Sequence, residues 1–176
     1  MKQSIVSMSQ CINALRKWTG KKNVLVLYDS MADECSTYTF FDSIKGKEQI
    51  AVIGFTPEGD VLGYYCKACL LRQDTTIFDP DLFLFSFESR GRCKTPKRFL
   101  PKRGVKNDLG LGFSIHWASD SFANVFVARC GSISFGNERL KDGCSGLSKA
   151  FKDMEDLTLT GNQYPCYSRL IAVRLF

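Results

Sequence analysis

The stretch IAVIGFTPEGDVLGYYC, residues 50 to 66, decides the class of fold. Residues 50 to 56 form a short apolar run with β-branched side chains, which is typical of a strand. Pro57 and Gly59 then supply the preset and the permissive backbone that a tight turn needs, and a second apolar run follows at once. The stretch therefore predicts a β-hairpin.

Strand-like runs recur along the rest of the chain, at residues 24–28, 82–87, 111–117, 124–129 and 167–175. Little helical sequence separates them. Because parallel strands need long crossover connections, this order of elements favours antiparallel pairing.

Two stretches carry apolar residues at helical spacing, residues 4–19 and a shorter one at 146–155. We therefore expect an α+β, mainly β fold: an antiparallel β-sandwich flanked by an N-terminal helix and a short second helix. In this interpretation residues 1–19 are an amphipathic helix packed on a domain formed by residues 20–176.

The charge of the chain is concentrated in one segment. The 176 residues have a net charge of +6, yet RGRCKTPKRFLPKRGVK, residues 90–106, holds eight basic residues and no acid. The rest of the chain is therefore close to neutral, and a local basic patch favours steering toward an anionic partner. The eight residues are Arg90, Arg92, Lys94, Lys97, Arg98, Lys102, Arg103 and Lys106.

We interpret this basic segment as an extended, solvated arm within an irregular connection at residues 88–108. Three roles stay open for it: a mobile loop, a docking surface for an acidic protein or membrane face, and a contact to the nucleic-acid backbone. No DNA- or RNA-recognition motif accompanies it, so nucleic-acid binding would be poorly selective.

The expected compartment follows from the lack of recognisable targeting signals in the sequence. The first twenty residues lack the apolar run and cleavage site of a signal peptide, and no window approaches about 18 consecutive apolar residues. We expect a cytoplasmic protein without membrane insertion, with the nucleus as the alternative. The eight cysteines are then expected to be free thiols, mostly buried.

The pair Cys66 and Cys69 has metal-ligand spacing and is the strongest candidate for thiol chemistry. The second half of a zinc site is missing, because the chain has no other such pair and one histidine, His116. We predict no metal site. Structural thiols are favoured, and a redox pair activated by Lys67 or Arg72 is the alternative.

No catalytic pattern emerges from the sequence. It contains neither a nucleophile elbow nor a phosphate-binding glycine loop, and Asp29, Asp33 and Glu34 do not follow the spacing of a calcium loop. We expect a protein that is not an enzyme and that needs no cofactor.

Five stretches together resemble the TLDc domain family over residues 18–176, most closely its short single-domain versions in unicellular eukaryotes. They are LYDSMADE at 27–34, GDVLGYY at 59–65, LFLFSFES at 82–89, CGSISFGN at 130–137 and the terminal LTLTGNQYPCYSRLIAVRLF at 157–176. The resemblance implies a β-sandwich flanked by helices, and structural motif positions at Gly63, Tyr65, Phe135, Gly136 and Gly161. Leu62 departs from the family's phenylalanine, and Val173 and Arg174 replace an acidic residue.

The family is associated with resistance to oxidative stress, and several members bind the vacuolar proton-pumping ATPase. The resemblance therefore implies a non-enzymatic interaction domain that acts in stress-related regulation through contacts with a protein partner whose identity is open. The alternatives are a nucleic-acid-associated regulator that uses residues 90–106, and a thiol antioxidant that uses Cys66 and Cys69.

Overall fold

The computed structural model describes most of the chain, and the following paragraphs concern this part alone. The described residues are 6–72, 75–104, 109–113, 121–127, 131–136, 144–145, 147–155, 158–161 and 166–176.

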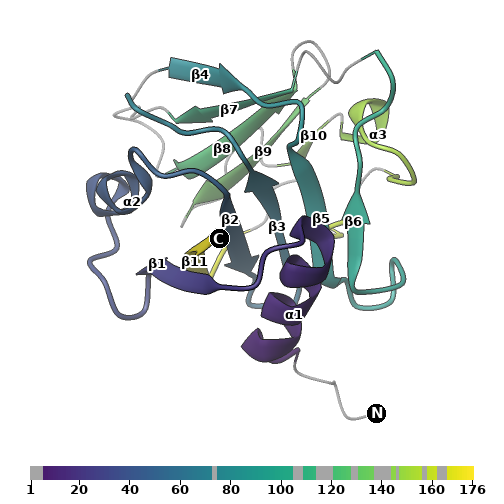
Figure 1. The fold of residues 1–176 in the computed structure, drawn as a ribbon. Coiled ribbons are helices and arrows are strands. Elements are labelled where there is room, and N and C mark those ends of the chain that lie inside the picture. The colour runs from purple at the N-terminus through teal and green to yellow at the C-terminus, as the bar shows by residue number, and fades with distance from the viewer. Residues whose placement is uncertain are drawn as a thin grey trace.

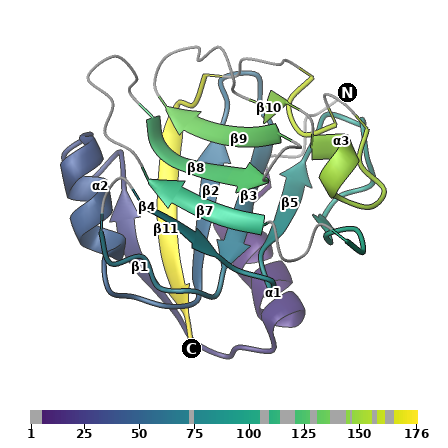
Figure 2. The same cartoon turned by 90° about the horizontal axis from the view of Figure 1, so that it is seen from above.

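The fold is α+β, with antiparallel strand pairs in two sheets (Figure 1). The larger sheet has the order β1-β11-β2-β3-β5-β6, and the smaller has the order β10-β9-β8-β7-β4. The helices are α1 (Met8–Thr19), α2 (Thr37–Ile44) and α3 (Leu147–Ala150). The strands are β1 (Val24–Asp29), β2 (Ile50–Phe55), β3 (Val61–Cys66), β4 (Thr75–Phe78), β5 (Phe83–Glu88), β6 (Lys97–Phe99), β7 (Leu109–Phe113), β8 (Ser121–Val127), β9 (Gly131–Gly136), β10 (Cys144–Ser145) and β11 (Arg169–Leu175). Figure 2 views the same fold from above, with β7, β8 and β9 in front of β2 and β3.

The predicted hairpin is confirmed as β2 and β3, which pair from Ile50 opposite Cys66 to Phe55 opposite Val61. The turn closes where the Thr56 amide donates to the Asp60 carbonyl oxygen at 3.0 Å. Gly59 lies there at a φ of 97°, in the left-handed region that glycine adopts without strain.

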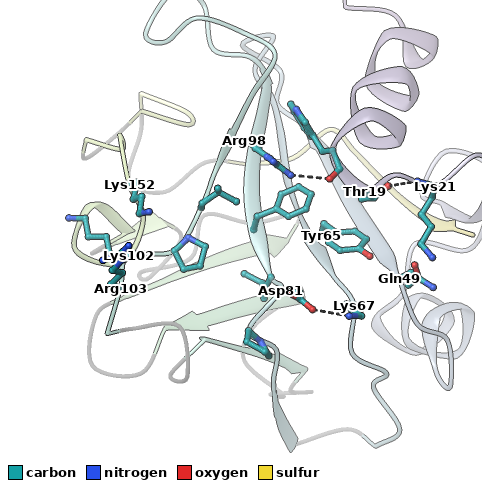
Figure 3. A pocket seen from close by; sticks show the side chains of 16 residues that line it. Thr19, Lys21, Gln49, Tyr65, Lys67, Asp81, Arg98, Lys102, Arg103 and Lys152 are labelled. Atoms are coloured by element: carbon teal, nitrogen blue, oxygen red, sulfur yellow. Dashed lines mark hydrogen bonds and ion pairs between the residues drawn. The ribbon is translucent and has the colours of Figure 1, made fainter.

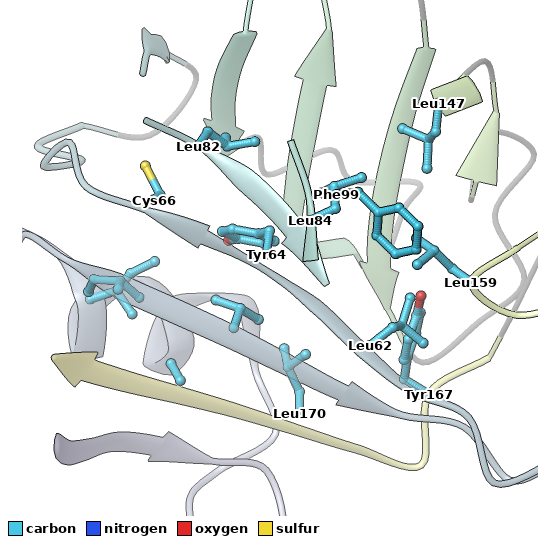
Figure 4. Packing of buried hydrophobic residues seen from close by; sticks show 14 of the residues in the cluster. Leu62, Tyr64, Cys66, Leu82, Leu84, Phe99, Leu147, Leu159, Tyr167 and Leu170 are labelled. Carbon is cyan, nitrogen blue, oxygen red and sulfur yellow. The ribbon is translucent and has the colours of Figure 1, made fainter. Parts of the chain in front are cut away.

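The central strands β2, β3 and β5 of the larger sheet are buried on both faces, which explains why they are almost continuously apolar in sequence. Residues such as Leu62, Tyr64 and Leu84 face one core (Figure 4). Their neighbours in the strands, among them Tyr65 and Phe83, face a second core that also holds residues of α1.

Helix α1 begins at Met8 because the preceding Ser7 caps it. The Ser7 hydroxyl accepts a hydrogen bond from the Gln10 amide, and the Gln10 side chain accepts one from the Ser7 amide. The helix ends at Gly20, which adopts the left-handed conformation at a φ of 73°. Cys11 and Leu15 are fully buried against the larger sheet.

The expectation of one further helix is wrong in two respects. Residues 37–44 form α2, which Ser36 caps and whose Phe40, Phe41 and Ile44 are buried. The helix expected at 146–155 is confined to α3, after which Phe151 bridges to Pro101. Strands β4, β6 and β10 were also not expected. The later parts of the runs 111–117 and 124–129 lie outside the described residues.

Candidate functional site

A pocket of about 630 Å³ lies between the end of α1, the strands β3 and β5, and the chain that follows β6 (Figure 3). Its rim is strongly basic. Asp81 is the one acid among the described residues that line it. The cations are Lys21, Lys67, Arg98, Lys102, Arg103 and Lys152.

Arg98 holds a central and fixed position in this pocket. It belongs to β6, where it pairs with Phe85, and its guanidinium lies 5.7 Å from the centroid of the Phe83 ring. Its Nη1 donates a hydrogen bond to the Trp18 carbonyl oxygen at 3.0 Å. Trp18 is in the last turn of α1, where the helix dipole favours a cation. These contacts orient the Arg98 side chain, which stays exposed to solvent.

The other cations differ in how freely they can meet a ligand. The Lys67 ammonium lies 2.9 Å from the Asp81 carboxylate, which raises the pKa of Lys67 and offsets its charge locally. Lys102 Nζ donates to the Ser148 carbonyl oxygen at 2.7 Å, which holds this side chain, and no carboxylate of the described residues pairs with it. Figure 3 shows Lys152, Lys102 and Arg103 on one side of the pocket and Lys21 on the other.

Two of the aromatic side chains that line the pocket, Tyr65 and Phe83, are almost completely buried, whereas Trp18 is partly exposed. Tyr65 is 5% exposed and Phe83 is 4% exposed, and their rings stack with centroids 5.0 Å apart. Burial raises the pKa of Tyr65 to about 12, so its hydroxyl is protonated at neutral pH. On the rim, by contrast, Leu100 is 41% exposed beside the cations.

The prediction of a solvated arm at residues 90–106 is wrong for its central part. Phe99 is buried in the core. Lys97 Nζ lies 5.0 Å from the centroid of that ring and donates to the Asp153 carbonyl oxygen at 3.1 Å. Sequence reasoning treated the eight charges as one solvated group, whereas β6 pairs this segment with β5 and buries Phe99.

Arg92 has a structural role. Its Nη2 donates to the buried Asp60 carboxylate and, at 3.1 Å, to the Leu159 carbonyl oxygen, while its Nε donates to the Thr158 carbonyl oxygen at 3.3 Å. Arg92 thus joins the β2–β3 turn to residues 158–161. Gly161 lies against the Arg92 guanidinium at a φ of 65°.

The structure divides the predicted basic residues accordingly. Arg98, Lys102 and Arg103 line the pocket, whereas Arg90 and Lys94 do not. Lys106 lies outside the described residues. Sequence reasoning missed Lys21, Lys67 and Lys152, which are distant from the segment along the chain. Helices or strands separate each of them from the basic segment along the chain, so the local density of charge in the sequence does not indicate that they belong to the pocket.

Cys66 does not have the environment of a reactive thiol. It is fully buried, it donates to the Ala68 carbonyl oxygen at 3.5 Å, and burial together with nearby Asp79 raises the pKa of its thiol well above the ordinary value. Lys67, one of the two cations that the redox alternative named for its activation, pairs with Asp81. Cys66 and Cys69 are both free thiols. Among the described residues, no group of three potential protein ligands could hold a metal ion.

The motif glycine in β3 has a steric function. A Cβ atom at Gly63 would lie 1.9 Å from the Val52 carbonyl oxygen and 2.7 Å from the Phe85 ring, so only glycine fits where the strand backbone meets both groups. Phe135 and Gly136 end β9, where they pair with Ala123 and Ser121. The backbone positions of these residues fit a structural use.

Asp29 likewise serves the fold. Its carboxylate accepts two hydrogen bonds from the Arg169 guanidinium, and these lower the pKa of Asp29. Asp33 accepts a hydrogen bond from the Asp29 amide at 2.8 Å. Asp33 therefore stabilises the turn after β1, and Asp29 links β1 to β11.

Comparison with the models of known protein families and with curated proteins finds no match for this chain. None of the described helices has the length and apolar character needed to cross a bilayer.

Proposed function

We infer that the chain is a non-enzymatic, TLDc-like interaction domain that takes part in oxidative-stress-related regulation and holds an anionic protein partner in the basic pocket. The observation that carries this inference is the gathering of six cations and one carboxylate around a single concave surface. Cations that follow α1 and β3, that lie in β6 and in the chain after it, and that follow α3 meet there, although they are scattered along the sequence. The proposal places the protein in the cytoplasm.

The make-up of the pocket supports binding more than catalysis. Its described lining residues include no cysteine, serine or histidine, so a serine–histidine or cysteine–histidine pair is missing from this part of the surface. Lysines and arginines with carbonyl contacts suit the recognition of fixed negative charge.

The TLDc-like part of the proposal rests on the sequence resemblance and includes a β-sandwich flanked by helices. Three observations support it. The β2–β3 hairpin contains Gly63 in a position that excludes a side chain. A buried core lies on the face of the larger sheet away from α1. Gly161 packs against Arg92 in the stretch that precedes the terminal strand.

The pocket can be tested with fluorescein-labelled heparin as a general polyanion. The variant Lys21→Glu, Arg98→Glu, Lys152→Glu reverses three charges of the pocket, while Arg16→Glu, Lys45→Glu, Lys94→Glu reverses three exposed charges that do not line it. Because both variants change the net charge equally, a difference between their heparin affinities shows that binding depends on where the charges lie. Three reversed contacts should weaken binding by about tenfold or more in the pocket variant, and the second variant should change it by less than about threefold.

Equal weakening of heparin binding by the two variants would contradict the proposal, because it would indicate diffuse attraction by the whole protein. Circular dichroism and the midpoint of thermal unfolding control for folding. Arg98→Gln serves as a milder change at the central position if the triple variant unfolds.

A further inference from the structure

The pocket offers more than positive charge, because an exposed aliphatic side chain lies between its cations. Leu100 follows Arg98 by two residues and precedes Lys102 by two, and its side chain is 41% exposed. Pro80 and Pro101 also line the pocket. A ligand that is complementary to this surface therefore carries both negative charge and an apolar group.

The aromatic rings that line the pocket are engaged with other side chains, and Trp18 alone among them is partly exposed, which limits the faces on which nucleic-acid bases could stack. Tyr65 stacks on Phe83, and Arg98 lies over the Phe83 ring. The Trp18 ring is stacked on Phe87, with centroids 5.7 Å apart and an interplanar angle of 6°. Single-stranded nucleic acid gains much of its affinity from stacking on open aromatic faces, so this surface suits a different anion.

Arg98 is arranged to meet a carboxylate. Its Nη1 is engaged by the Trp18 carbonyl oxygen, and no contact of the described residues occupies its Nη2. The planar fork of a guanidinium matches the two oxygens of a carboxylate, and a side chain that is already oriented loses less entropy on binding.

From these observations we propose that the pocket binds a short acidic peptide segment of a partner protein, with a carboxylate on Arg98 and an aliphatic side chain against Leu100. This inference rests on the proposed function and specifies its ligand. The volume of about 630 Å³ lies within the range typical of small-ligand sites. The cations on the two sides of the pocket provide contacts for further carboxylates of the same peptide (Figure 3).

The test compares three labelled probes by fluorescence anisotropy at one salt concentration. The first is a glutamate-rich peptide that contains leucine, the second has serine in place of leucine, and the third is an oligothymidylate of the same charge. The wild-type protein should bind the leucine peptide about tenfold more tightly than the serine peptide, since the burial of one leucine contributes an effect of that order.

Two pairs of variants locate this preference. Leu100→Ser should reduce it to less than about threefold, whereas Leu71→Ser should preserve it, because Leu71 is 62% exposed and does not line the pocket. Arg98→Lys keeps the charge but loses the fork, so it should weaken both peptides by about tenfold. Lys94→Arg is the matched control, at an exposed position outside the pocket.

The outcomes separate this inference from the proposed function. Tighter binding of oligothymidylate than of either peptide would overturn the peptide assignment and leave the anion pocket intact. Equal affinity for both peptides, or a preference that Leu100→Ser does not change, would also overturn it. If the pocket variant and the variant outside the pocket weakened heparin binding equally, the proposed function itself would be overturned.

Discussion

At the scale of single residues, Arg92 and Arg98 show that neighbouring charges of one basic segment serve different purposes. The Arg92 side chain is 26% exposed and pairs with the buried Asp60, so its charge stabilises the fold. Arg98 is exposed and lies over a ring at the pocket. Sequence identifies both as cations, but burial of the partner distinguishes their roles.

Replacement of Arg92 by methionine should lower the free energy of unfolding by about 2–3 kcal/mol at neutral pH, because Asp60 would stay buried without its partner. Urea denaturation measures this loss. Arg90→Met, at an exposed neighbour, should change stability by less than about 0.5 kcal/mol. Equal effects of the two changes would refute the structural role of Arg92.

Asp29 predicts a dependence of stability on pH. The Arg169 guanidinium lowers the pKa of Asp29 below its ordinary value of 3.8. The unfolded chain therefore binds a proton more readily than the folded protein, and the contribution is present above pH 3.8 and lost as pH falls through the folded pKa. Asp29→Asn should cost about 1 kcal/mol at neutral pH, since the pair is partly exposed.

Denaturation of the wild type and Asp29→Asn across a series of pH values provides the measurement. The difference between the two proteins should narrow as pH falls below 3.8. A difference that is constant over the whole acid range would show that the charge of Asp29 is not its source.

Gly63→Ala should be among the most destabilising small changes in the chain. The added methyl group would meet the Val52 carbonyl oxygen at 1.9 Å, and a backbone atom within a paired strand cannot move away easily. We expect a loss of about 3 kcal/mol or more, measured as a lower midpoint of urea unfolding. Gly46→Ala has open space around the site and serves as the comparison, with a smaller cost from its φ of 71°. The reverse order of the two costs would contradict this steric explanation.

At the scale of elements, the sequence predicts a segment well where burial and local pattern agree. The hairpin at 50–66 has two apolar runs joined by a clear turn, the terminal strand β11 has an apolar centre, and both were predicted. Helix α2 was missed because its threonines and phenylalanines have low helix propensity. Its signals were the cap at Ser36 and the spacing of Phe40, Phe41 and Ile44, which face the core.

Strand β6 was missed for a related reason. Three residues are too few to display alternation, and Lys97 and Arg98 obscure the single buried side chain, Phe99. Its pairing with β5 is a tertiary contact that local sequence does not contain.

Helix α1 positions the Trp18 carbonyl that orients Arg98, and it is held to the sheet by Leu15. Leu15→Ala should cost about 2–4 kcal/mol, because this side chain is fully buried. The exposed change Asn13→Ala should be neutral or slightly stabilising. Thermal and urea unfolding distinguish the two, and a neutral Leu15→Ala would mean that α1 does not pack as described.

At the scale of the whole molecule, the fold forms a basic pocket whose residues are only partly those of the basic segment. Half of its cations come from residues 98–103, and the remainder are Lys21, Lys67 and Lys152. The sequence could predict that residues 90–106 attract anions. It could not predict which cations converge, because convergence depends on how α1 and the chain after α3 meet the larger sheet.

The most direct measurement is the rate of lysine acetylation, determined by mass spectrometry with and without the leucine-containing acidic peptide. Binding in the pocket predicts that Lys21 and Lys152, which lie on opposite sides of it, are both protected (Figure 3). The exposed Lys45 and Lys94 should react at unchanged rates, because neither lines the pocket. Uniform protection of all four lysines, or protection of Lys45 and Lys94 alone, would contradict a partner site in the pocket.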